Sequence, residues 1–257
     1  MIATLLLVAI GTSVTQVSRH SFISTKEQHP GHRSVSGGLA RAAVFGVSDG
    51  LVSNVSLVIG FAASGVDASV VRLAGIAGAI AGAASMAAGE WVSVSAQNEL
   101  ITRELEIEKR ELHVNTAAET LELAKIYESH GIEPERAALA AADVMRKPDV
   151  ALGVHAREEL GVDPGVLPSA MGAALLSLIC FLFGALTPVI PWYIVSGNGA
   201  LISSVTIGVG FAAVVGALIG RFAERNVSLS ALRQVLILLG ACGVTYLIGQ
   251  LFNVNVA

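Results

Sequence analysis

Acidic side chains recur at helical spacing in the middle of the chain. Glu104, Glu108 and Glu111 follow one another at steps of four and three residues, which places them on one face of a helix. Glu119 and Glu122 repeat the three-residue step in the next helical stretch. Carboxylates this close repel one another at pH 7, and binding a divalent cation relieves that repulsion. The spacing therefore predicts a metal site, with a solvated helix face as the alternative for any single glutamate.

A histidine adds a nitrogen donor to these carboxylates. His155 and Glu159 stand four residues apart on one face of a later helix, with Glu158 beside them and Asp163 one turn beyond. The acidic stretch contains no cysteine, so its donors are oxygen and imidazole nitrogen, which suit Fe²⁺, Mn²⁺ and similar divalent ions. The predicted ligands are Glu104, Glu108, Glu111, Glu119, Glu122, His155 and Glu159, and Glu158 and Asp163 remain open as further ligands.

Two more acids interrupt stretches that are otherwise apolar. Asp49 shares a helix face with Ser53 and is close to Asn54, while Met86 lies one turn before Glu90. An ionisable residue within a membrane span is costly and marks an ion path or a proton relay. We therefore expect these five residues to line a transport path. For Glu90, a carboxylate that reaches the headgroups is the alternative.

The elements that carry these residues are apolar helices. Of the 257 residues, 53% are apolar and only 14% are charged, and the mean hydropathy is +0.69. This composition argues against a disordered chain, a coiled coil, a disulfide scaffold and a water-soluble enzyme. A bilayer core about 30 Å thick needs about 20 apolar residues as helix. Five stretches meet or approach that length: 41–65, 73–97, 167–190, 199–220 and 234–253.

Charge is concentrated in one insert between the second and third spans. From Glu99 to Asp163 lie 15 of the 20 acidic and 8 of the 16 basic residues, a net charge of −7 against +3 for the rest of the chain. The second span continues into this insert without Gly or Pro before Asn115, and further helices are expected at 117–130, 134–146 and 149–160. The predicted domains are a tail at 1–38, helices at 39–97, the insert at 98–165 and helices at 166–257.

Basic residues orient the chain in the membrane. With a cytoplasmic N-terminus, the external loops 66–72 and 188–198 contain only Arg72, and the other 15 Lys and Arg lie inside. This predicts a cytoplasmic N-terminus, a cytoplasmic insert and an external C-terminus. Gly46 and Gly50 in the first span, and the small residues of the second, predict close backbone contact between those two helices. The fold class is therefore an all-α polytopic membrane protein with five transmembrane helices and a cytosolic helical metal-binding insert.

Four strings resemble the vacuolar iron transporter family, which includes the yeast calcium-sensitivity-complementing and plant nodulin-21-like transporters. They are LARAAVFGVSDGLVSNVSLVIGFA, AGAASMAAGEWVSVSAQNE, HAREELGVDP and FLFGALTPVIPW, and the similarity covers roughly 33–255. The resemblance implies a five-helix homodimer that exchanges cytosolic Fe²⁺, often also Mn²⁺, for protons. It implies that Asp49 and Met86 line a path between protomers. It further implies metal binding by Glu108, Glu111, Glu119, Glu122 and Glu159, with Glu104 as an addition.

One departure from that family concerns the metal preference. Plant members have a methionine pair where this chain has His155 and Ala156, and the harder nitrogen donor is expected to tilt selectivity away from soft ions. The prediction is a proton-coupled exporter of Fe²⁺ or Mn²⁺, with Co²⁺ and Zn²⁺ as further cargo. We expect the protein to have no enzymatic activity, no resident cofactor and no nucleic-acid partner. We place it in a bacterial inner membrane rather than a vacuole, because no residue indicates a vacuole.

Two other functions stay open at this point. A membrane-bound di-iron carboxylate ferroxidase would use Glu-x-x-His pairs, and this chain has no glutamate followed three positions later by histidine. A metal-binding membrane scaffold that does not transport would leave the acids within the spans unexplained.

Overall fold

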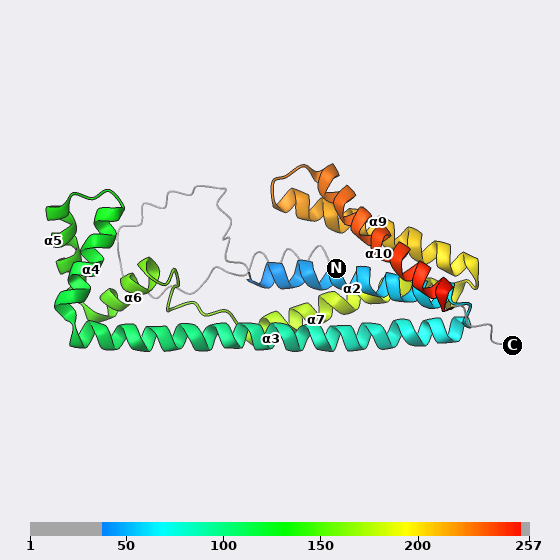
Figure 1. Cartoon of the computed structure of the whole chain (residues 1–257), viewed down its shortest axis with the longest axis horizontal. Helices are drawn as coiled ribbons and strands as arrows, with labels where there is room; N and C mark the ends of the chain where they lie inside the picture. The colour runs from blue at the N-terminus through cyan, green and yellow to red at the C-terminus, as the bar shows by residue number, and fades with distance from the viewer. Residues whose placement is uncertain (1–37, 253–257) are drawn as a thin grey trace. The chain divides into compact units, whose positions relative to one another are not determined.

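The computed structural model describes residues 38–252, and all its described elements are helices (Figure 1). Five of these helices are long and apolar enough to cross a membrane. The prediction of an all-α chain with five spans is therefore confirmed. The tail predicted for residues 1–38 lies outside the described residues, except for Gly38 at the start of the first helix.

The helices follow one another with short connections. In chain order they are α2 (Gly38–Ala63), α3 (Ala68–Val114), α4 (Thr116–Ser129), α5 (Pro134–Met145), α6 (Pro148–Glu158), α7 (Ala170–Leu186), the 3-10 helix η1 (Thr187–Val189), α8 (Pro191–Ile194), α9 (Asn198–Phe222) and α10 (Val227–Leu251). They form two compact units. The membrane unit holds the described residues up to 91 and from 171 onward, and the insert unit holds residues 92–170.

Helix α2 packs against several other helices of the membrane unit. Leu51 and Val55 of α2 form a buried cluster with Ala212 of α9 and Leu238 of α10. On another side, a Cβ added at Gly50 would collide with the backbone of Phe181 in α7. The close backbone contact predicted for the glycines of the first span is thus made with α7. The predicted contact between the first two spans is made through the glycines of the second span, because Gly75 and Gly78 of α3 face side chains of α2.

Two helix ends differ in instructive ways from the predicted spans. Helix α7 ends at Leu186, and the chain continues as η1 and α8 around Pro188, which lacks the N–H that an α-helix requires there. Helix α10 begins at Val227, before the predicted start at residue 234, because the Asn226 side chain accepts a hydrogen bond from the Leu229 N–H at 3.1 Å. Hydropathy alone leaves out the first turns of α10, because they contain the charged Arg233.

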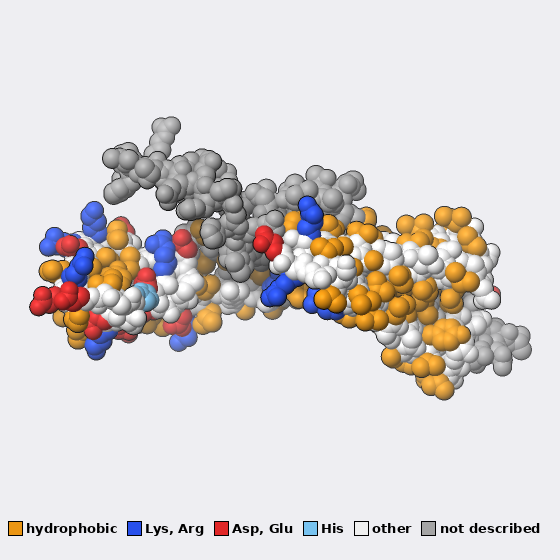
Figure 2. Space-filling view, turned by 90° about the horizontal axis from the view of Figure 1, so that it is seen from above, with side chains coloured by type: hydrophobic (Ala, Val, Ile, Leu, Met, Phe, Trp, Pro, Cys, Tyr) orange, Lys and Arg blue, Asp and Glu red, His pale blue; other side chains and the backbone are white. Residues whose placement is uncertain are grey.

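Helix α3 is too long to lie within a membrane. Its 47 residues rise about 70 Å, whereas about 20 residues cross a bilayer core of about 30 Å. Its C-terminal half therefore lies outside the membrane-spanning segment. In Figure 2, apolar side chains cover much of the visible surface of the membrane unit, and charged side chains gather over the insert unit. The two units thus present different surfaces, one suited to lipid and one to water.

Helices α4, α5 and α6 complete the insert unit with the end of α3. Helix α4 is followed by Gly131, whose φ of +88° suits glycine, and the Ile132 N–H bonds to the Tyr127 carbonyl at 3.2 Å in a Schellman motif. Pro134 begins α5, as predicted, and Pro148 begins α6 one residue before its predicted start. Leu123, Ala124 and Ala141 form the small buried core that holds α4 against α5.

Candidate metal centre

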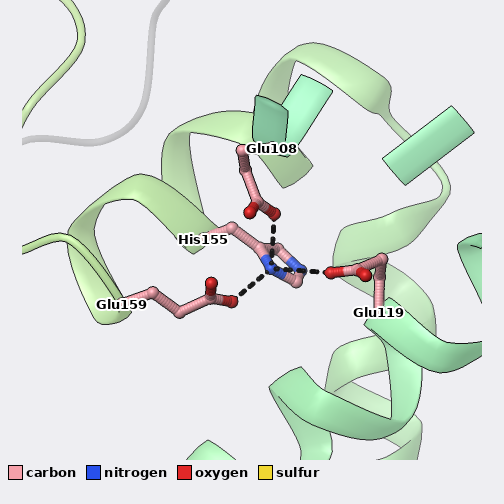
Figure 3. A group of neighbouring side chains, drawn as sticks. All are labelled: Glu108, Glu119, His155 and Glu159. Carbon is pink, nitrogen blue, oxygen red and sulfur yellow. Dashed lines mark hydrogen bonds and ion pairs between the residues drawn. The ribbon is translucent and has the colours of Figure 1, made fainter. Parts of the chain in front are cut away.

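Four side chains from three helices of the insert unit converge on one point (Figure 3). Glu108 comes from α3, Glu119 from the first turn of α4 and His155 from α6, and Glu159 is the residue that caps the C-terminal end of α6. One donor atom from each lies within 4.8 Å of the others, so a single cation can contact all four. We refer to these four residues as the metal cluster.

The imidazole of His155 lies at the centre of the metal cluster and is fully buried. Its Nδ1 is 2.7 Å from Oε1 of Glu159, a hydrogen bond favoured by their i, i+4 spacing on α6. The same Nδ1 lies 3.1 Å from Oε1 of Glu108 and 3.8 Å from Oε2 of Glu119. A single N–H serves one acceptor well, so the buried Oε1 of Glu108 has no hydrogen-bond partner, and neither has the buried Nε2 of His155. The cluster therefore has more acceptors than donors and suits a cation.

Burial and mutual repulsion shift the titration of two of these carboxyl groups. Burial raises the pKa of Glu108 to about 7, the charge of Glu159 contributes to the rise, and His155 opposes it. Burial also raises the pKa of Glu119, with the charge of Glu122 as the next cause. Near neutral pH a proton and a cation therefore compete for Glu108.

Three of the predicted ligands lie outside the metal cluster. Glu104 is partly exposed and lies 3.4 Å from Arg103 on its own helix, whereas Glu111 and Glu122 lie nearby without joining the four donors. Helical spacing predicts which residues share a face of α3 or α4, but it does not bring these three carboxylates among the four donors of the metal cluster. Glu111 still acts at a distance, because its charge raises the pKa of both Glu108 and Glu119.

The two acids that the sequence left open have other partners. Glu158 lies 3.8 Å from Nδ1 of His130, and Asp163 accepts hydrogen bonds from Arg157 at 3.4 Å and from the Gly165 N–H at 3.1 Å. Asp163 therefore shapes the turn after α6.

A second candidate site lies in the membrane unit. Asp49, Ser53, Asn54 and Met86, all predicted path residues, line one cavity of about 360 Å³ whose wall comes from α2, α3 and Phe181 of α7. The cavity offers a carboxylate, a hydroxyl, an amide and a thioether.

The cavity also contains one polar residue that the sequence analysis did not single out. Ser85 lines it beside the predicted path residues. A signal for Ser85 was available, because it directly precedes Met86 and lies one turn after Gly82 on the same helix. Its hydroxyl adds a third neutral oxygen donor to the cavity, after those of Ser53 and Asn54.

Glu90, the fifth predicted path residue, does not line this cavity. Its Oε1 accepts a hydrogen bond from Nη2 of Arg41 at 3.2 Å, which joins α3 to the start of α2. Spacing gave no signal for this ion pair, because the two residues are 49 positions apart on different helices. In this structure Glu90 therefore pairs with Arg41 and stands apart from the residues that line the cavity.

Comparison with known proteins decides the family. A model of the VIT family matches residues 40–250. This chain belongs to the VIT family. Similar VIT proteins include the vacuolar iron transporter 1 of Oryza sativa subsp. japonica, 29% identical over 81% of this chain and 83% of the relative. Others are the vacuolar iron transporter 1 of Eucalyptus grandis, 30% identical over 82% and 85%, and the vacuolar iron transporter of Acanthamoeba castellanii, 34% identical over 74% and 71%.

The comparisons bear on several of the predictions for this VIT protein. The resemblance to the vacuolar iron transporter family is confirmed, and the chain is an integral membrane protein with several spans. All three relatives are named as transporters, which agrees with the prediction that the chain is not an enzyme. Their names place them in vacuoles, and the bacterial inner membrane stays a prediction for this chain.

Proposed function

We propose that this VIT protein is a proton-coupled transporter that moves Fe²⁺ or Mn²⁺ out of the cytosol. The observation that carries the proposal is the metal cluster, in which three carboxylates and one imidazole converge in the insert unit. The names of its relatives, which are iron transporters, support iron as a cargo. The insert captures the cation, and the membrane cavity binds it during passage.

The chemistry of the metal cluster supports a divalent cargo of intermediate hardness. Its donors are oxygen and nitrogen without sulfur, a set that suits Fe²⁺ and Mn²⁺ and also accepts Co²⁺ and Zn²⁺. Because Glu108 titrates near neutral pH, binding of the cation releases a proton from the cluster. Cargo and protons therefore compete at the point of capture.

The membrane cavity supports the exchange step. Asp49 and Met86 line it together, and both are donors that a divalent cation accepts. A carboxylate within a span that gives up its cation can take up a proton instead, which couples the two fluxes in opposite directions. The positive-inside distribution, with only Arg72 in an external loop, supports a cytoplasmic N-terminus and insert and thus export from the cytosol.

We also propose that two copies of the chain assemble. Helix α3 lines the cavity of Asp49, yet its membrane-spanning part is largely exposed within the single chain, as are those of α9 and α10. A second copy would cover that face and close the path away from lipid.

The proposal is tested by transport in proteoliposomes with a pH gradient. The wild-type chain is expected to move Fe²⁺ and Mn²⁺, with uptake lost in Asp49→Asn and strongly reduced in Met86→Ala. The matched controls are Asp67→Asn and Met171→Ala, which change the same residue types outside the cavity and should retain uptake. Unchanged uptake in the two cavity variants would refute the path.

The same preparation separates the alternatives. Metal binding without any transport would identify a scaffold, and oxygen consumption on addition of Fe²⁺ would identify a ferroxidase. Uptake that is independent of the pH gradient would contradict proton coupling.

A further inference from the structure

Asn54 is a buried amide in the middle of a membrane-spanning helix. Its side chain belongs to α2 and the residue is 2% exposed. Its Nδ2 donates one hydrogen bond to the Gly75 carbonyl of α3 at 3.0 Å and another to the Ala185 carbonyl of α7. One side chain thus ties three helices of the membrane unit together.

The bond to α7 has a specific cause. Helix α7 ends at Leu186, so the carbonyls of its last turn lack the N–H partners that a continuing helix would supply, and Pro188 has no N–H to offer at all. In a membrane these carbonyls have no water to bond to and need partners within the protein. The Thr187 hydroxyl serves the Phe183 carbonyl at 2.8 Å, and Asn54 serves that of Ala185.

These two bonds determine where the amide oxygen points. Backbone carbonyls only accept hydrogen bonds, so the nitrogen of Asn54 must face them and Oδ1 must face the other way. There it lies 2.9 Å from the position that a Cβ at Gly78 would take. Asn54 and Gly78 both line the cavity that contains Asp49 and Met86.

We propose that Oδ1 of Asn54 is a ligand for the transported cation, and that Gly78 keeps the approach to this oxygen open. This inference rests on the proposed function and deepens it. The amide oxygen is a neutral, hard donor, and it joins the Asp49 carboxylate and the hydroxyls of Ser53 and Ser85 as oxygen donors beside the soft Met86 sulfur. Such a set favours Mn²⁺ and Fe²⁺ over Zn²⁺, because oxygen donors suit the harder ions.

The main test is Gly78→Ala in proteoliposomes, with Gly240→Ala of α10 as the control, because a Cβ at Gly240 meets nothing within 4 Å. The added methyl would lie 2.9 Å from Oδ1, so it obstructs this oxygen and displaces it slightly. We expect the KM for Mn²⁺ to rise about tenfold and the ratio of Mn²⁺ to Zn²⁺ uptake to fall, with a smaller fall in Tm than a variant that loses both bonds of the amide nitrogen. This Cβ also meets Leu57 at 2.6 Å, so the pair Leu57→Ala and Leu57→Ala/Gly78→Ala repeats the comparison without that contact.

A second variant separates ligation from the structural role of the amide. Asn54→Leu removes both helix ties and the oxygen, so it should lower the Tm and also lower the Mn²⁺ to Zn²⁺ ratio in the protein that folds. A lowered Tm with a wild-type ratio would overturn the ligand role, as would a wild-type KM and ratio in the Gly78 variants. Absence of uptake by the wild-type chain would instead refute the proposed function, and this inference with it.

Discussion

Glu108 makes the stability of the insert unit depend on pH in a direction that can be calculated. Its pKa is about 7 in the folded protein against an ordinary value of 4.5. Because its pKa is raised in the folded protein, the protonated Glu108 side chain stabilises the fold. This contribution to the free energy of unfolding is fully present below pH 4.5 and is lost as the pH rises through 7. Each pH unit between the two pKa values corresponds to about 1.4 kcal/mol, so the free energy of unfolding of the metal-free insert unit should fall by about 3 kcal/mol between pH 4.5 and pH 7.

The perturbation is Glu108→Gln, which keeps the shape of the protonated carboxyl and cannot ionise. The metal-free variant should keep its stability at pH 8, where the wild type has lost about 3 kcal/mol. The affinity for a cation should depend on pH in the opposite direction, rising with pH while the stability of the metal-free protein falls. In the wild type the dissociation constant for Mn²⁺ should rise about tenfold from pH 8 to pH 6, since the cation must displace the proton of Glu108. The variant should bind Mn²⁺ weakly at both pH values.

The assay is hydrogen exchange of the backbone amides of α4 and α6 in the full chain from pH 5 to pH 8, with and without Mn²⁺, after correction for intrinsic exchange. Glu104→Gln is the control, because Glu104 lies on the same helix outside the metal cluster. Parallel pH profiles for wild type and Glu108→Gln would refute the reasoning, as would a Mn²⁺ affinity that does not change between pH 8 and pH 6.

Three further predictions concern other parts of the chain. His155→Ala removes the only nitrogen donor of the metal cluster and should raise the dissociation constant for Mn²⁺ at least about tenfold in a titration, whereas Glu104→Gln should not. Arg41→Ala should change the unfolding free energy in detergent by no more than about 1 kcal/mol, because the Arg41 side chain is 58% exposed; a larger loss would show a buried role. Gly50→Ala should lower the Tm, because its methyl would collide with the α7 backbone, at a cost of about 1–3 kcal/mol or more, and Gly243→Ala, which meets open space, should not.

The helices could be predicted from the sequence because their signals are local. Apolar length marked the five spans, and glycine and proline marked the ends of α4, α5 and α6 within a few residues. The prediction failed where a local signal was overridden. Arg233 lowered the hydropathy at the start of α10, yet the cap at Asn226 starts the helix there.

The candidate sites divide in the same way. Helical periodicity placed His155 beside Glu159 and placed Glu104, Glu108 and Glu111 on one face, because both pairings depend only on residue spacing. It could not select Glu108 over its neighbours. That selection depends on where α4 and α6 fold back against α3, which buries Glu108 and leaves Glu111 exposed.

The sequence by itself determined the kind of protein: an all-helical membrane chain with an acidic insert and acids within its spans. Only the tertiary structure decided which partner each polar side chain meets. Arg41 reaches Glu90 across 49 residues, and Asn54 reaches Ala185 across 131. Spacing along a helix fixes which residues share a face, but burial and the partners of each polar atom depend on which helices pack together, and that packing is not a local property of the chain.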